Sequence, residues 1–260
     1  MNDDRNWTVL FIGGASGIGK SSLAYEIARH YGVNVLEVDD VHLAVKTMTT
    51  KEHFPAIHYW DSGVDWKELG VNGNVNWLIE VSKEMSLVLK ELANRHIEDR
   101  LPIIIEGDFI HPELTLSFDH PEVKSIFVHE SDKNQIVRNY AAREGGELQH
   151  FRAEVSIAYG EWIAETCKRN GIRWIESRPW DTALSRAQKK FVVRELSSDR
   201  VVPIPGVLHL PKSDIPYFHI SLKGDRELLG ILKINGGRPK FMALSFCGRG
   251  HILLSIGGYA

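Results

Sequence analysis

A short run near the N-terminus has the residue types and spacing of a loop that binds phosphate. It begins at Gly14, ends at Lys20-Ser21 and fits the pattern G-x-x-x-x-G-K-[ST]. Glycines let the backbone wrap closely enough for its N–H groups to point at phosphate oxygens, and a following helix adds partial positive charge. Lys20 can then reach the β- and γ-phosphates while the Ser21 hydroxyl binds Mg²⁺. The pattern therefore predicts a site for ATP and Mg²⁺.

The residues predicted to contact this nucleotide lie in the loop or in the first turn after it. They are Gly14, Ala15, Ser16, Gly17, Ile18, Gly19, Lys20, Ser21 and Ser22, with Ser21 as the predicted metal ligand. A glycine-rich turn that only packs would explain neither Lys20 nor Ser21. An overlapping pattern, G-x-x-x-G-x-G from Gly13, is typical of short-chain dehydrogenases, but no tyrosine has the lysine four residues later that those enzymes carry.

Carboxylates stand at two further places where phosphoryl chemistry needs them. Asp39 and Asp40 follow a β-rich run at 33–38, and Glu106 follows a second run at 103–105. Open parallel sheets bind ligands at the carboxyl ends of their strands, and a carboxylate there can orient or deprotonate a hydroxyl. We expect Asp39 to be the base, with Asp40 as the alternative; a solvated turn or helix cap is the other interpretation. Glu106 could hold the metal through water or accept a hydrogen bond from the acceptor.

Arginines after the fourth β-rich run could act on the transferred group. Arg138 and Arg143 flank Asn-Tyr-Ala-Ala and are followed by Gly145-Gly146. This order fits a mobile lid, hinged at the glycines, whose arginines neutralise phosphoryl charge and exclude water. A solvated helix face is the other interpretation.

The elements that position these groups alternate along the first 200 residues. The predicted strands are 7–12, 33–38, 103–105, 123–128 and 172–175. Helical spacing predicts a helix over 20–31 that Gly32 ends, and a later one with the apolar stripe Leu78, Val81, Met85, Val88 and Leu92. Such alternation predicts a parallel sheet with right-handed crossovers, covered on both faces.

Composition and charge exclude several classes of protein. The chain has 260 residues, of which 43% are hydrophobic and 25% charged, as in an average globular protein. Its net charge of −3 argues against nucleic acid as a main partner. Cys167 and Cys247 lie far apart, and the histidines show no metal spacing. The polar N-terminus and the lack of an apolar run of about 18 residues predict a cytoplasmic protein with no membrane partner.

Composition changes near Ser197-Ser198. Residues 201–260 hold 9 of the 22 glycines and 5 of the 10 prolines, but none of the seven tryptophans. We therefore predict one domain over 1–198 and a small β-rich C-terminal element over 199–260, which begins with a hairpin of 217–222 and 227–234. This element is a candidate surface for homo-oligomer formation.

Three motifs together resemble a family of kinases. They are Gly-Gly-Ala-Ser-Gly-Ile-Gly-Lys-Ser-Ser from Gly13, Val-Asp-Asp-Val-His from Val38, and Ile-Ile-Glu-Gly-Asp-Phe-Ile-His-Pro from Ile104. The chain is similar to P-loop small-molecule kinases, most of all to the 2-phosphoglycerate kinase family and more distantly to zeta-toxin and chloramphenicol phosphotransferase kinases. The resemblance implies a three-layer α/β P-loop NTPase domain of nucleotide-kinase type with strand order 2-3-1-4-5. It also implies an adenine-binding loop at Arg178 to Trp180, where an Arg or an aromatic ring can stack on the base.

The residue three positions after Asp39 differs from the residue that this family usually has there. The family usually has Arg there, whereas this chain has His42, which argues against a phosphorylated acceptor. We expect transfer of the ATP γ-phosphoryl group to a hydroxyl of a small molecule, held by a helical insertion over 41–100. The alternative is a non-catalytic or slowly hydrolysing ATP-binding protein whose nucleotide state is read by a partner.

Overall fold

The computed structural model describes residues 5–191, 218–223, 227–232, 240–247 and 251–257. The chain divides into two units, 1–195 and 196–260. The predicted boundary at Ser197-Ser198 lies outside the described residues and stays a prediction. Among the helices that the structure describes, none is both long and apolar enough to cross a membrane.

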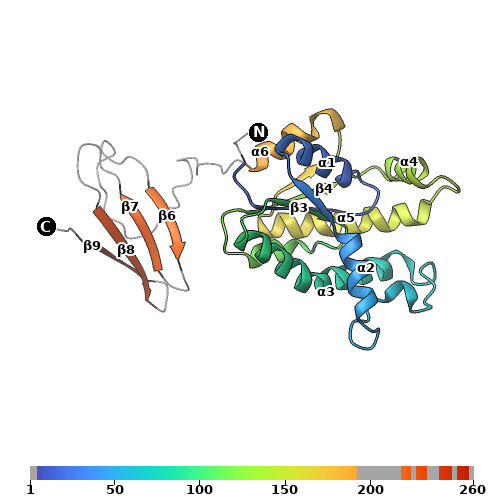
Figure 1. Cartoon of the computed structure of the whole chain (residues 1–260), viewed down its shortest axis with the longest axis horizontal. Coiled ribbons are helices and arrows are strands. Elements are labelled where there is room, and N and C mark those ends of the chain that lie inside the picture. The colour runs from blue at the N-terminus through green and yellow to red at the C-terminus, as the bar shows by residue number, and fades with distance from the viewer. Residues whose placement is uncertain (1–4, 192–217, 224–226, 233–239, 248–250, 258–260) are drawn as a thin grey trace. The chain divides into compact units, whose positions relative to one another are not determined.

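The first unit is built on a parallel five-stranded sheet (Figure 1). Its strands are β1 (Val9–Gly13), β2 (Asn34–Glu37), β3 (Ile103–Gly107), β4 (Val123–His129) and β5 (Trp174–Glu176). Their order in the sheet is β2-β3-β1-β4-β5, which confirms the predicted order. Both β1 and β3 are buried along their whole length, as expected for central strands with helices on both faces.

Helices form the two outer layers. They are α1 (Lys20–Tyr31), α2 (Val38–Met48), α3 (Gly70–Glu98), α4 (Lys133–Glu144), α5 (His150–Asn170) and α6 (Ala183–Phe191), with short 3₁₀ turns η1 (Tyr59–Asp61), η2 (Pro112–Ser117) and η3 (Trp180–Thr182). In Figure 1, α1 and α6 lie on one side of the sheet and α3 and α5 on the other. The predicted three-layer α/β class is confirmed.

The predicted helices pack as their apolar spacing indicates. Helix α1 has the predicted bounds, and Gly32 ends it in the left-handed conformation with φ of 66°. On α3, Val81 and Met85 are fully buried, and the other members of the predicted stripe pack partly buried against the same core. The predicted insertion over 41–100 carries η1, α3 and all of α2 except its first three residues.

The end of the second strand differs from the prediction. Pairing of β2 with β3 stops at Glu37, and Val38 already begins α2. Asp39 and Asp40 therefore lie in the first turn of a helix and not in a loop after a strand. Acidic residues are stabilised there by the positive end of the helix dipole.

The described strands of the second unit pair with one another. They are β6 (Phe218–Lys223), β7 (Glu227–Leu232), β8 (Lys240–Cys247) and β9 (His251–Gly257), antiparallel in that order. The predicted hairpin of 217–222 and 227–234 falls partly outside the described residues. The domain limits and the oligomer surface stay predictions.

Candidate active site

The loop between β1 and α1 holds three glycines in conformations that other residues rarely adopt. The angle φ is 148° at Gly14, 76° at Gly17 and 90° at Gly19. A Cβ on Gly14 would lie 2.6 Å from the carbonyl oxygen of Val128. Gly19 caps α1 with no side-chain hydrogen bond, and the first turn of α1 contains no acidic residue. The helix therefore presents its first amide groups to an anion, which fits a nucleotide phosphate.

Residues far along the chain brace this loop. Asn139 on α4 donates from Nδ2 to the carbonyl oxygen of Gly17 at 2.7 Å. A Cβ on Gly17 would lie 2.9 Å from the ring of Tyr140, and one on Gly19 would lie 2.3 Å from the ring of Trp180. Both α4 and η3 therefore pack directly on the phosphate loop.

Gly19→Ala should destabilise the fold by about 1–2 kcal/mol through the left-handed backbone alone, and it should also displace Trp180. Gly32→Ala is the matched control, because Gly32 has a positive φ of 66° and open space where the Cβ would lie. Urea denaturation measures the stabilities, and calorimetry measures ATP affinity. The double variant Gly19→Ala/Trp180→Ala should recover the part of the loss that is due to the clash. Equal stability and equal ATP affinity in the two single variants would contradict the packing of Trp180 on the loop.

Lys20 is buried beside two carboxylates. Its Nζ forms an ion pair with Asp108 and lies 3.5 Å from Oε1 of Glu106. Burial by itself lowers the pKa of Lys20, but the two carboxylates outweigh burial and raise it above its ordinary value. Lys20 is therefore a permanent cation at the base of the phosphate loop.

The two carboxylates follow each other at the carboxyl end of β3. Burial raises the pKa of Glu106, while Lys20 and a hydrogen bond with Ser21 partly oppose that rise. Asp108 lies just beyond the strand, and its carbonyl oxygen accepts a hydrogen bond from Tyr159 at 3.1 Å. Sequence reasoning gave Asp108 no role, although its spacing of two residues from Glu106 is the strand period that places both on one face.

Asp39 and Asp40 on α2 have different surroundings. Burial, and then repulsion by Asp108, raise the pKa of Asp39, while Lys20 lowers it. Asp40 instead acts on Tyr25, whose hydroxyl hydrogen-bonds Glu37. Neighbouring helix residues point about 100° apart, so only one of the pair can face the lysine. The structure brings Asp39, and not Asp40, together with Lys20 and Asp108.

No metal cage exists in the part of the chain that the structure describes. No group of three or more His, Cys, Asp or Glu side chains there is placed to hold an ion. Ser21 is an exposed residue beside the loop, and its side chain hydrogen-bonds Glu106. A Mg²⁺ ion at this site would therefore depend on Ser21 and on phosphate oxygens, which is the usual arrangement in this motif.

Arg143 lies in the last turn of α4. Its guanidinium lies 2.5 Å from Glu144 and 5.5 Å from the centroid of the Tyr140 ring. The arginine acts electrostatically on both Asp39 and Asp108. Gly145 and Gly146 follow with positive φ angles and connect α4 to α5.

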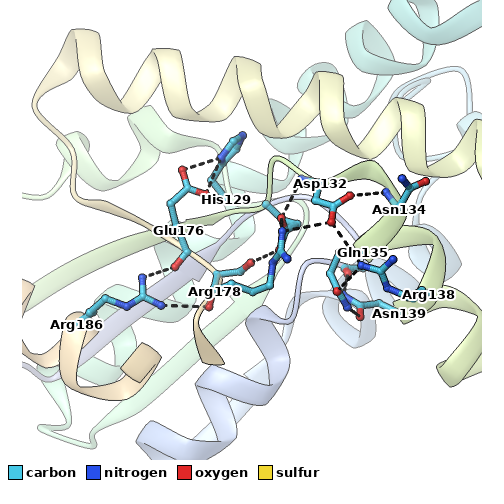
Figure 2. A network of polar contacts seen from close by, with 12 residues as sticks. His129, Asp132, Asn134, Gln135, Arg138, Asn139, Glu176, Arg178 and Arg186 are labelled. Carbon is cyan, nitrogen blue, oxygen red and sulfur yellow. Dashed lines mark hydrogen bonds and ion pairs between the residues drawn. The ribbon is translucent and has the colours of Figure 1, made fainter. Parts of the chain in front are cut away.

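Arg138 lies in a different polar network (Figure 2). It donates to Gln135 at 2.8 Å and lies 3.4 Å from Asp132, near the start of α4. The two predicted lid arginines therefore have different surroundings, and only Arg143 interacts with the carboxylates around Lys20.

Arg178 belongs to the same network. It donates from Nε and Nη2 to the buried carboxylate of Glu130, at 2.7 Å in both cases, and lies 3.5 Å from Asp132. A guanidinium held in this way fixes the loop after β5. Trp180, two residues later, is 40% exposed. The Arg178 side chain is exposed to the same extent, 39%, so the predicted roles of both residues in binding a base stay predictions.

Comparison with known proteins points to one kind of enzyme. A 2-phosphoglycerate kinase from Methanopyrus kandleri is 28% identical over 162 residues, covering 60% of this chain and 49% of that protein. Another from Methanocaldococcus jannaschii is 23% identical over 184 residues, covering 66% and 59%. The chain is similar to 2-phosphoglycerate kinases. This confirms the resemblance inferred from the three motifs. The chain spans about half to three fifths of the length of these relatives, and no family model matches it.

Solved structures show a weaker likeness. A gluconokinase from Sinorhizobium meliloti covers 72% of this chain and 92% of its own, with 16% identity and a TM-score of 0.42. A shikimate kinase from Acinetobacter baumannii covers 72% and 92%, with 15% identity and a TM-score of 0.41. At this level of similarity neither structure identifies an acceptor for this chain.

Proposed function

We propose that this protein transfers the γ-phosphoryl group of ATP, with Mg²⁺, to a hydroxyl group of a small molecule. The observation that carries the proposal is the convergence of Lys20, Asp39, Glu106 and Asp108 beside the phosphate loop. A phosphate loop alone serves many functions, but a carboxylate beside it can also accept a hydroxyl proton. Similarity to 2-phosphoglycerate kinases supports the same conclusion.

Asp39 is the proposed general base. It takes the proton of the acceptor hydroxyl as the new oxygen–phosphorus bond forms, and the bond from the γ-phosphorus to the bridging oxygen of ADP breaks. Burial and Asp108 raise the pKa of Asp39, which moves it toward the operating pH, where a base is most effective. Asp40 is kept as the alternative base, although its surroundings favour it less.

The other side chains position phosphate and neutralise charge. Lys20 holds the β- and γ-phosphate oxygens, and the Ser21 hydroxyl would hold Mg²⁺, which supplies charge neutralisation when bound. Glu106 orients Ser21 through their hydrogen bond. Asp108 holds Lys20 in place before ATP binds. Positioning and charge neutralisation together provide most of the rate in such reactions.

Arg143→Ala should lower turnover by about 10²-fold with a much smaller effect on ATP affinity, because Arg143 would stabilise charge that develops in the transition state. Arg138→Ala is the matched control, since its interactions with Asp132 and Gln135 lie outside the carboxylate group. Steady-state kinetics at varied ATP concentration measures kcat and the KM for ATP. Arg143→Lys should rescue poorly, because lysine lacks the planar fork. Normal turnover in Arg143→Ala would show that Arg143 does not stabilise the transferred phosphoryl group as part of a lid.

The fate of the γ-phosphate tests the proposal as a whole. The protein is incubated with γ-labelled ATP, Mg²⁺ and a protein-free extract of small molecules, and the labelled products are separated. We expect a labelled compound distinct from inorganic phosphate that Lys20→Ala does not produce. Label that appears only as inorganic phosphate would favour the slowly hydrolysing ATP-binding protein instead.

A further inference from the structure

We infer that the acceptor is an uncharged polyhydroxyl compound, such as a free sugar or a cyclitol, bound by Asp39, His42 and Trp60. This inference rests on the proposed function, because it specifies the acceptor of that reaction. An aromatic cluster beside the carboxylates, the hydrogen-bonding capacity of His42 and the charges around both support it.

An aromatic cluster surrounds His42 and continues beyond Trp60 to the ring of Tyr59, which lies 5.4 Å from that of Trp60. The ring of His42 lies 5.1 Å from that of Phe109 and 5.7 Å from that of Trp60, and the rings of Trp60 and Phe109 are 5.7 Å apart. Phe109 is buried, but Trp60 is 52% exposed. The open face of Trp60 therefore offers an aromatic surface on which a ligand can pack.

The cluster lies next to the reacting groups. Asp39 and His42 are three residues apart on α2, so they lie on one face of the helix. Phe109 directly follows Asp108, which pairs with Lys20. A molecule on the open face of Trp60 can therefore reach Asp39 with a hydroxyl group.

His42 supplies a hydrogen-bond acceptor. Its Nε2 lies 3.1 Å from the carbonyl oxygen of Ile57, which can only accept, so Nε2 carries the hydrogen. Burial lowers the pKa of His42, so the ring is neutral at pH 7 and Nδ1 is an acceptor. Among the described residues, none donates to this Nδ1. Asp39 and His42 thus present two acceptors on one helix face, which match two hydroxyl donors.

The surrounding charges disfavour an anionic acceptor. The charged or titratable groups that act on His42 are Lys46, His58 and Asp61. The Nζ of Lys46 lies 2.6 Å from Asp61, so its charge is already countered. His58 shares a hydrogen bond with Thr49 at 3.1 Å. A phosphate or carboxylate placed here would instead face the carboxylate of Asp39 on the same side of α2.

The remaining nearby cations already face carboxylates of the protein. Lys20 is paired with Asp108 and Glu106, and Arg143 reaches Asp39 only from the end of α4. Uncharged hydroxyls bring no such repulsion, and the C–H face of a sugar ring is flat and apolar enough to pack on an indole. A free sugar or cyclitol can therefore donate hydrogen bonds to the two acceptors, pack on the open aromatic ring and avoid repulsion by the nearby carboxylate.

An acceptor screen tests this inference. ADP formation is measured with Mg·ATP and free pentoses, hexoses and myo-inositol, each compared with its own monophosphate, and with 2-phosphoglycerate. We expect turnover with at least one uncharged compound and a kcat/KM at least about 100-fold lower for its monophosphate, because like charges in an interface are strongly unfavourable. Turnover confined to phosphorylated or carboxylated acceptors would overturn the inference and leave the proposed function intact.

Two tryptophan variants locate the acceptor. Trp60→Ala should raise the KM for the uncharged acceptor by about tenfold, as expected for loss of one aromatic contact, and leave the KM for ATP nearly unchanged. Trp66→Ala is the matched control, since Trp66 is 41% exposed on the same insertion but packs on Phe151, with ring centroids 5.0 Å apart. Equal KM values in the two variants would overturn the placement. No turnover of any compound by protein that binds Mg·ATP would overturn the inference and the proposed function together.

Discussion

Lys20→Ala should lower phosphoryl transfer by on the order of 10³-fold or more, because it removes a preorganised cation from the phosphate loop. The structure adds a second reason. Without Lys20, Glu106 and Asp108 lose the cation that counters them, and their negative charge would then repel the triphosphate. Affinity for Mg·ATP should therefore fall together with turnover.

Calorimetric titration with Mg·ATP and a coupled ADP assay measure these effects. The variant Lys20→Ala/Asp108→Asn removes part of the uncompensated charge, so it should regain stability in urea without regaining turnover. Lys133→Ala is the surface control, because Lys133 forms an exposed ion pair with Glu154 at 2.9 Å. Wild-type affinity and turnover in Lys20→Ala would refute the phosphate-loop assignment.

Asp39→Asn should lower phosphoryl transfer by about 10²–10⁴-fold while ATP still binds, because the amide keeps the shape of the side chain but cannot accept the proton. Asp40→Asn is the matched control from the adjacent position on α2, and it should retain near-normal turnover. Single-turnover kinetics separates transfer from binding. If Asp40→Asn is the inactive variant, the base is Asp40; if both variants are active, the acid pair only stabilises the start of α2.

The pH profile of turnover provides an independent check on Asp39. The base acts only when deprotonated, so activity falls as pH drops through the pKa of Asp39. Burial and Asp108 raise this pKa above its ordinary value, so the loss should begin at a higher pH than for a free aspartate, whose pKa is about 3.9. The residual activity of Asp39→Asn should lack this acid limb.

Local signals were sufficient to predict most of the fold. Helix α1 was predicted with its bounds because apolar spacing and Gly32 both mark it. The strand order followed from the resemblance to kinases and was confirmed. The start of α2 was missed, because a β-rich run and a helix start overlap at Val38, and only the loss of pairing with β3 decides between them.

The site was predictable where chemistry follows a linear motif. Lys20 and Asp39 were predicted from such motifs, and the structure brings them together. The difference between Arg138 and Arg143 could not be predicted, because it depends on which carboxylates surround each one in space. The partner of Arg178 is likewise invisible in sequence, since Glu130 lies 48 residues away.

The bracing of the phosphate loop limits how far this motif can be transplanted. Its backbone is held by Asn139, whose hydrogen bond to Gly17 spans 122 residues of chain, and it packs against Tyr140 and Trp180. A graft of the loop and α1 onto another scaffold would carry the glycines and the lysine but none of these supports. Engineering this loop therefore requires α4 and the segment after β5 to be moved with it as one module.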